Sequence, residues 1–196
     1  MGEIIIPFHG GKLVVPHEAA ARAWLDKVLA ASDASATTTA IAVPRIGEYW
    51  DGQGGIYAGA MPLEDGGIAH RIVSIDEAED FEYGGYDHTV AGADSKLDGL
   101  ANTQALLSDS KEHPAAKWCA DYAKDGHSDF YLPAQRELSL AWATVATVFG
   151  PHWYWSSTQF SAHDAWYQNF GGGYQSHAYE YDEGRVRAFR RLNFSL

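Results

Sequence analysis

Histidine, cysteine and aspartate are the residues through which this chain could do metal or nucleophilic chemistry. Its nine histidines include no HExxH pair and no His–Cys cluster at the spacing of zinc ligands. Several aspartates in expected loops could hold a calcium ion, but the EF-hand loop pattern is missing. We therefore expect no zinc site and no required cofactor, and the alternative is a structural calcium ion at Asp94, Asp98, Asp125 and Asp129.

Cys119 is the single cysteine of the chain, so it has no internal partner for a disulfide. It falls at helical spacing beside Trp118 and Tyr122, and a thiol on an apolar helix face is typical of packing rather than of nucleophilic reactivity. No Ser–His–Asp spacing and no glycine-rich phosphate loop stands out either. The chain is therefore predicted not to be an enzyme.

The charge balance argues against nucleic acid as a partner. The formal net charge is −12, whereas phosphate backbones and anionic lipids are bound through Lys and Arg. The longest apolar runs, such as 138–148, fall far short of a membrane span, and no secretory signal is recognisable near the N-terminus. We expect a soluble protein made in the cytoplasm, without membrane insertion.

The segment 160–184 has the composition of an adaptable binding surface. Between Gly171 and Gly184 there are three tyrosines and four glycines, but no Leu, Ile, Val or Met. Tyr supplies contact area at a low entropy cost, while Ser and Gly supply hydrogen bonds and backbone freedom. The alternative at this point is a flexible glycine-rich hairpin that binds nothing.

Motifs of the opposite kind bracket this segment: WSST at 155–158, AWYQNF at 165–170 and RVRAFR at 185–190. Together with YLP at 131–133 and the pair Glu137 and Leu138, they resemble the C-type-lectin-like domain that ends Legionella-type collagen-like proteins. The resemblance is to the members of that family that are diversified by retroelements, which are related in fold to the phage major tropism determinant. It covers roughly 45–196 and implies a C-type-lectin-like fold with a variable region at about 155–190.

The genetic code supplies a check on this resemblance. Retroelement diversification replaces template adenines, so an Asn codon of the form AAY can become Tyr, His, Asp, Ser, Gly, Ala or Phe, but never Trp, Gln, Glu, Lys or Met. The predicted variable, ligand-binding positions all belong to the reachable set: Phe160, His163, Asp164, Gly171, Gly172, Tyr174, Ser176, His177, Ala178, Tyr179, Tyr181, Asp182 and Gly184. Glu180 and Glu183 do not belong to it, although one A-to-G change in a Lys codon gives Glu.

Residues between or beside the variable positions, among them Trp166, Gln168, Gln175 and Arg185, are predicted to be a fixed scaffold that packs while the variable ones face outward. Large aromatic side chains in such a frame would each contribute a few kcal/mol by burial. The resemblance implies that Ser156, Ser157 and Asn169 order the frame by hydrogen bonding. The predicted scaffold residues are Trp155, Trp166, Tyr167, Phe170, Arg185 and Arg187.

The resemblance implies a diversified receptor-binding protein at a phage tail-fibre tip, whose partner is a host cell-surface protein or another surface ligand. One alternative is a bacterial display protein, in the cytoplasm or cell-associated rather than in the virion. A second is an oxygenase like the formylglycine-generating enzymes, disfavoured because Cys119 lacks a second cysteine for copper. A third is a purely structural virion component. By family analogy we expect a homo-oligomer, specifically a trimer.

The N-terminal part, 1–44, differs in character from the rest. Apolar runs at 4–6 and 13–15 flank a glycine turn and predict a hairpin, and 18–31 has the apolar spacing of a helix. The small polar stretch 32–42 reads as a linker. Because a lone hairpin and helix need a partner surface, we expect 1–44 to be a docking or oligomerisation segment ahead of a ligand-binding domain at 45–196.

Strands are predicted at 56–61 and 69–75, joined through 64–67 and followed by an acidic stretch, 76–98, without regular structure. Two helices are then expected. The first covers parts of 101–124 and can restart at Pro114, and the second begins at Pro133. Its apolar side is Leu138, Trp142, Val145 and Phe149.

Short strands at 154–158, 165–170 and 185–191 complete the predicted domain. Strands followed by helices and then by strands are typical of an α+β domain. The expected fold is thus α+β and C-type-lectin-like, with two helices and a small antiparallel sheet.

Overall fold

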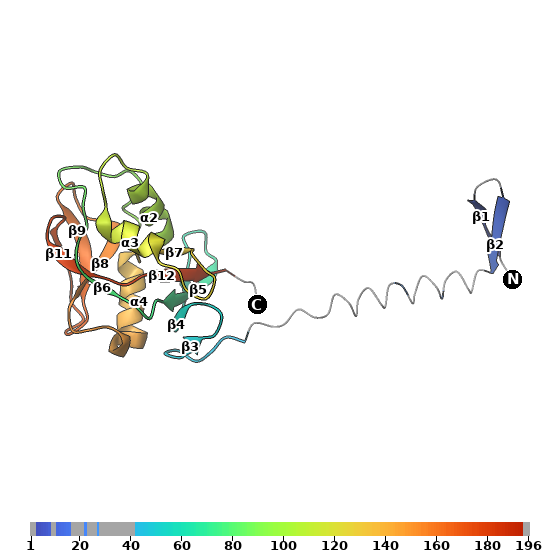
Figure 1. Ribbon diagram of the computed structural model, residues 1–196, viewed down its shortest axis with the longest axis horizontal. Coiled ribbons are helices and arrows are strands. Elements are labelled where there is room, and N and C mark those ends of the chain that lie inside the picture. The colour runs from blue at the N-terminus through green and yellow to red at the C-terminus, as the bar shows by residue number, and fades with distance from the viewer. Residues whose placement is uncertain (1–2, 9–10, 17–21, 23–26, 28–41, 194–196) are drawn as a thin grey trace. The chain divides into compact units, whose positions relative to one another are not determined.

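The chain divides into two compact units, 1–42 and 43–196, in a computed structural model that describes residues 3–8, 11–16, 22, 27 and 42–193 (Figure 1). In the first unit, β1 (Glu3–Phe8) and β2 (Gly11–Pro16) pair antiparallel, with Ile4 opposite Val15. The predicted hairpin is confirmed. The predicted linker apart from Ala42, and the predicted helix apart from Arg22 and Lys27, lie outside the described residues.

Within its described residues, the second unit contains two five-stranded sheets and three α-helices. One sheet has the strand order β10-β9-β8-β11-β6 and the other β3-β4-β5-β12-β7. The strands of the first are β6 (Ala78–Glu82), β8 (Trp153–Gln159), β9 (Asp164–Asn169), β10 (Gln175–Tyr179) and β11 (Glu183–Val186). Those of the second are β3 (Tyr49–Trp50), β4 (Gly55–Pro62), β5 (Ile68–Val73), β7 (Phe130–Tyr131) and β12 (Phe189–Leu192).

The helices lie between the early and late strands of the chain. They are α2 (Gly99–Leu107), α3 (Pro114–Asp121) and α4 (Gln135–Val145), which the 3-10 turn η1 (Ala146–Val148) extends. Pro114 begins α3, as expected of a residue without an N–H at the first helical position. The unit is therefore α+β as predicted, but with three helices instead of two.

The sheets also correct the prediction of one small antiparallel sheet. β8 and β11 pair in parallel, with Arg185 opposite Tyr154, whereas the other pairings are antiparallel. The acidic stretch predicted to be irregular contains β6, which pairs with β11 through Glu82 and Glu183. This pairing joins segments about a hundred residues apart, so no local alternation of apolar residues could reveal it.

The predicted strand at 185–191 is two strands that lie in different sheets. β11 ends at Val186 and β12 begins at Phe189, beside Val73 of β5. Ser74 holds the crossing point, because its N–H donates to the Ala188 carbonyl at 2.8 Å and its Oγ accepts from the Ala188 N–H at 3.1 Å. The C-terminal strands thereby tie the two sheets together.

The core is packed from both sheets and the helices. α2 contacts β8, α3 contacts β6 and β7, and α4 contacts β4, β8 and β9 (Figure 1). Apolar residues of α4 at helical spacing, Leu138, Ala141 and Val145, are buried together with Phe149. No helix in the described part of the chain is long and apolar enough to cross a membrane.

Candidate ligand-binding surface

The hairpin of β9 and β10 has an inner and an outer face. Trp166 lies opposite His177, and Tyr179 follows two residues along on the same side. Ala165 and Ala178, the pair between them, face the other way and pack on the buried core. The glycine-rich segment thus forms an ordered strand whose alternate residues point outward.

Aromatic rings gather where the turn before β9, the turn after β10 and the loop after β6 meet. Tyr179 stacks on Tyr181 with ring centroids 5.2 Å apart, and Tyr86 meets Tyr181 at 4.9 Å and His163 at 5.1 Å. The three tyrosines are 41–49% exposed. We call these four residues the tyrosine cluster.

Main-chain hydrogen bonds hold the three segments of the tyrosine cluster together. The Gly84 N–H donates to the Glu180 carbonyl at 2.9 Å, and the Glu180 N–H donates to the His163 carbonyl at 3.0 Å. The His88 N–H donates to the Ala162 carbonyl at 3.0 Å. Since none of these bonds uses a ring, the tyrosines can change without losing them.

A second group of rings, the Phe160 cluster, adjoins along the same face and consists of Phe160, Trp166 and His177. Phe160 stacks on His177 at 4.1 Å and meets Trp166 edge-on at 5.2 Å. The Lys96 ammonium lies over the Trp166 ring at 5.6 Å, within the range of a cation–π interaction. Trp166, predicted as scaffold, is half-buried and belongs to this surface.

Among the residues whose exposure the structure describes, Tyr174 is the most exposed large apolar or aromatic side chain, at 70%. It follows Gly173, whose φ of 78° favours glycine and whose Cβ, if present, would lie 2.3 Å from the Trp142 ring. Trp142 was predicted on the buried side of α4, but it is 42% exposed. Its ring covers this turn instead of entering the core.

The predicted aromatic scaffold lies beneath these clusters. Trp155 is buried and donates from Nε1 to the Phe81 carbonyl at 2.8 Å, and Tyr167 stacks on it at 5.3 Å. Phe170 is buried and stacks on Phe149 at 3.8 Å. Aromatic pairs of this kind contribute energy beyond their buried area, which fixes the frame.

The polar residues that the resemblance assigned to the frame also make hydrogen bonds. Ser156 Oγ donates to the Trp166 carbonyl at 2.8 Å, Ser157 Oγ accepts from the Asn102 amide at 3.2 Å, and Asn169 Oδ1 accepts from the Gly172 N–H at 2.8 Å.

Arg185 and Arg187, the predicted charged scaffold residues, share one carboxylate. Both bind Glu77 at 2.6 Å, and Arg187 is buried. These contacts, with a hydrogen bond from Tyr154, hold the pKa of Glu77 below its usual value despite the opposing effect of burial. Both arginines therefore form ion pairs within the domain.

The predicted variable positions lie at the surface, and within the described range 160–184 none of them is buried. Two of them nevertheless contact the frame. Ala178 packs on the core, and a Cβ at Gly184 would lie 2.8 Å from Trp155 Nε1. The exposed positions are Phe160, His163, Gly171, Gly172, Tyr174, His177, Tyr179, Tyr181 and Asp182, and the half-buried ones are Asp164, Ser176, Ala178 and Gly184.

Sequence reasoning missed two contributors to this surface, Tyr86 and Lys96, because both precede the variable region by many residues. It also missed that Glu180 is fully buried between two exposed tyrosines. Glu180 Oε1 accepts from Gln159 Nε2 at 2.8 Å, and burial raises its pKa to about 7. The alternation of Tyr179, Glu180 and Tyr181 was the signal that could have revealed it.

The loop aspartates considered for calcium lie apart in separate contacts. Asp98 caps α2 and pairs with Arg191, Asp125 accepts from Tyr49 and Gly54, and Asp129 pairs with Arg190. Over 42–193 and the other described residues, no group of three or more His, Cys, Asp or Glu could hold a metal ion.

Cys119 is buried in the core, as predicted, and burial raises the pKa of its thiol well above the usual value. A thiolate is therefore disfavoured at this position.

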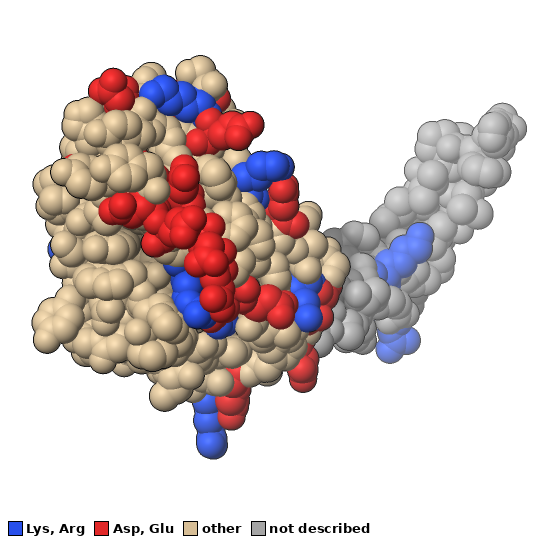
Figure 2. Space-filling view, turned by 60° about the vertical axis from the view of Figure 1, so that its left-hand side comes forward, with Lys and Arg blue, Asp and Glu red and all other residues tan. Residues whose placement is uncertain are grey.

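Acidic side chains gather on one face of the molecule. Figure 2, with the left-hand side of Figure 1 turned forward, shows them in a band with a nearly uncharged area beside it. Exposed carboxylates on the paired strands β6 and β11 include Glu79, Asp80, Glu82 and Glu183. Charges along an edge strand such as β6 discourage pairing with other chains.

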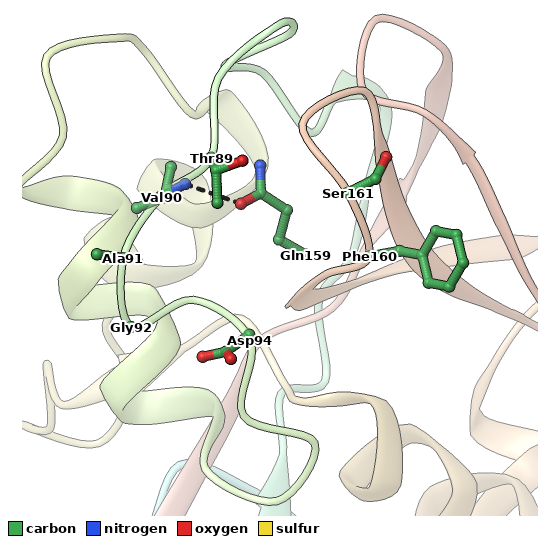
Figure 3. A pocket seen from close by; sticks show the side chains of 8 residues that line it. All are labelled: Thr89, Val90, Ala91, Gly92, Asp94, Gln159, Phe160 and Ser161. Carbon is green, nitrogen blue, oxygen red and sulfur yellow. Dashed lines mark hydrogen bonds between the residues drawn. The ribbon is translucent and has the colours of Figure 1, made fainter.

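Two pockets lie in the second unit. One, of about 290 Å³, lies between the 89–94 loop and the end of β8, and Phe160 lines it (Figure 3). The other, of about 420 Å³, lies at the connection of α2 to α3, and Lys111, His113 and Lys117 are among its lining residues.

A scan against protein-family models finds no match to this chain. A search of curated proteins finds no relative either.

Proposed function

We propose that this chain is a diversified ligand-binding protein with a C-type-lectin-like domain, which recognises a host-cell surface ligand from a phage tail-fibre tip. One observation carries the proposal. Aromatic residues of the predicted variable segment form two exposed or half-buried clusters on the β9–β10 hairpin and its turns, while buried aromatics and ion pairs of the same segment hold the frame. Exposed aromatic patches on monomeric domains mark interaction sites.

The chemistry of this surface suits a protein ligand. Tyr and Trp rings combine large contact area with polar tips, as in antibody paratopes, and both residue types are enriched at binding hot spots. The main-chain hydrogen bonds beneath the rings allow the side chains to vary while the surface keeps its shape. Repeated display in a homo-oligomer, which we propose is a trimer, would strengthen weak single-site binding through avidity.

Population sequencing of the gene tests the diversified character. We expect substitutions concentrated at exposed positions such as Tyr174, His177, Tyr179 and Tyr181, with Trp155 and Arg187 unchanged. Changes spread evenly over buried and exposed residues would exclude diversification.

Alanine substitution tests binding directly. The double variant Tyr179→Ala and Tyr181→Ala should weaken attachment of the purified chain to host cells by at least about tenfold, because hot-spot aromatics contribute 2 kcal/mol or more. Ile68→Ala is the matched control, since Ile68 is 67% exposed on the other sheet. Equal attachment by the double variant and the control would argue for a structural component whose tyrosines bind nothing.

A further inference from the structure

A pocket adjoins Phe160 of the proposed binding surface. Its lining residues are Thr89, Val90, Ala91, Gly92, Asp94, Gln159, Phe160 and Ser161. Figure 3 shows the 89–94 loop on one side, Phe160 and Ser161 on the other, and Gln159 between them. Phe160 also stacks on His177, so the pocket adjoins the Phe160 cluster.

Size restricts what the pocket can hold. Its volume of about 290 Å³ is at or below the lower limit of the roughly 300–1,000 Å³ found for small-molecule sites. A single side chain of a larger ligand fits such a volume better than a complete small molecule does.

The walls of the pocket are fixed before any ligand binds. Gln159 Oε1 accepts from the Val90 N–H at 2.8 Å, and its Nε2 donates to the His88 carbonyl at 2.7 Å. The Gln159 N–H donates to the Ala93 carbonyl at 2.8 Å. A loop held at three points requires little ordering on binding, which favours affinity.

Asp94 gives the pocket its charge. Among the described residues its carboxylate forms no hydrogen bond or ion pair, in contrast to Asp98, Asp125 and Asp129. Lys96, two residues along the chain, is directed at the Trp166 ring and makes no ion pair with Asp94. Asp94 is exposed, so it can attract a cation as the partner of a surface ion pair in a chain of net charge −12.

We propose that this pocket receives the cationic end of a lysine or arginine side chain of the protein ligand, with Asp94 as its counter-charge. The identification of the occupant as part of a protein rests on the proposed function. Because Asp94 and the rest of the 89–94 loop lie outside the variable region, the charge contact stays constant, while Phe160 on the opposite wall belongs to the variable positions and can change. One basic side chain would then anchor ligands that otherwise differ.

NMR titration of the full ¹⁵N-labelled chain tests this subsite with defined probes. The probes are Nα-acetyl-lysine methylamide, Nα-acetyl-arginine methylamide and the uncharged Nα-acetyl-norleucine methylamide. We expect the amide signals of Gly92, Asp94 and Gln159 to shift with the cationic probes and not with norleucine. The comparison of lysine with arginine identifies which cation fits.

Asp94→Asn should weaken binding of the cationic probes by up to about fivefold, the loss expected for one solvent-exposed ion pair. Asp80→Asn is the matched control, because Asp80 is an exposed aspartate of β6 outside the pocket, and it should leave binding unchanged. Equal shifts with norleucine, unchanged binding by Asp94→Asn, or no shift with any probe would each overturn the subsite.

The titration uses no host cell, so its failure leaves the proposed host recognition standing. Conversely, probe binding together with unaltered attachment of the Tyr179 and Tyr181 double variant would retain the cation subsite and reject the proposed function.

Discussion

Two buried glutamates, one in the frame of the domain and one beneath the exposed tyrosine cluster, differ in how well their carboxylates are hydrogen-bonded. Glu137 of α4 accepts hydrogen bonds from Arg71 Nε, from the Tyr131 hydroxyl at 2.7 Å and from the Ala134 N–H at 2.8 Å. Glu180, beneath the tyrosine cluster, has one oxygen bound to Gln159, and its Oε2 has no partner among the described residues. The first carboxylate is fully satisfied, whereas the second is only half satisfied.

This difference separates the part of the domain that depends on each buried side chain from the part whose exposed side chains can be substituted. Glu137 and Arg71 join α4 to β5 with side chains that are completely buried, so removing either one leaves a charge without compensation. Glu180 lies under a surface whose rings are exposed and can change. Different effects of substitution are therefore expected in the buried frame, at the buried carboxylate of Glu180, and where the frame meets the exposed surface.

The largest effect is expected in the frame. Glu137→Ala should lower the free energy of unfolding by about 3–5 kcal/mol, because the Arg71 guanidinium remains buried without its partner. Chemical denaturation measures this loss. The control is Asp121→Asn, which breaks the exposed pair with Lys117 and should change stability by less than about 1 kcal/mol. Similar losses in both variants would mean that the Glu137 pair is not a special feature of the frame.

Local sequence patterns were sufficient for the elements that depend on local forces. The hairpin at 3–16, the strands β4 and β5 and the stop of α4 before Gly150 and Pro151 follow from turn residues and apolar spacing. The strand β6 and the division at Arg187 and Ala188 could not be predicted, since both depend on pairing with distant segments.

For the candidate site, too, local sequence patterns identified the segment but not the residues that the fold brings to it from elsewhere. Composition selected the segment 160–184, and strand alternation separates its inner residues from its outer ones. Tyr86 and Lys96 could not be found, because only the fold brings them to the segment. Trp142 was misplaced because its helical spacing favours burial, and only the close approach of Gly173 shows what its ring covers.

The next largest effect concerns pH. Burial raises the pKa of Glu180 from 4.5 to about 7, so the folded state retains this proton to higher pH than the unfolded state does. The resulting stabilisation is fully present below pH 4.5 and is lost as pH rises through 7. At about 1.36 kcal/mol for each pKa unit, the loss is on the order of 3 kcal/mol.

The variant Glu180→Gln isolates this contribution, because other titrating groups are common to both proteins. We expect the variant to gain stability relative to the parent chain between pH 4.5 and 8, measured by denaturation at several pH values. A stability difference that stays constant over this range would mean that folding does not raise the pKa of Glu180.

The smallest effect lies at the boundary between frame and surface, where two glycines of the predicted variable set differ. A methyl group at Gly184 would lie 2.8 Å from Trp155 Nε1, whereas one at Gly171 would meet its neighbours at 3.3 Å on an exposed turn. Trp155 cannot retreat easily, because it is buried and bound to the Phe81 carbonyl. Gly184→Ala should therefore cost about 1–3 kcal/mol by overpacking, and Gly171→Ala less than about 0.5 kcal/mol, in the same denaturation assay. Equal costs would place Gly184 on the adaptable surface. Unequal costs would assign it to the frame, so that glycine should persist at 184 in a population whose neighbouring tyrosines vary.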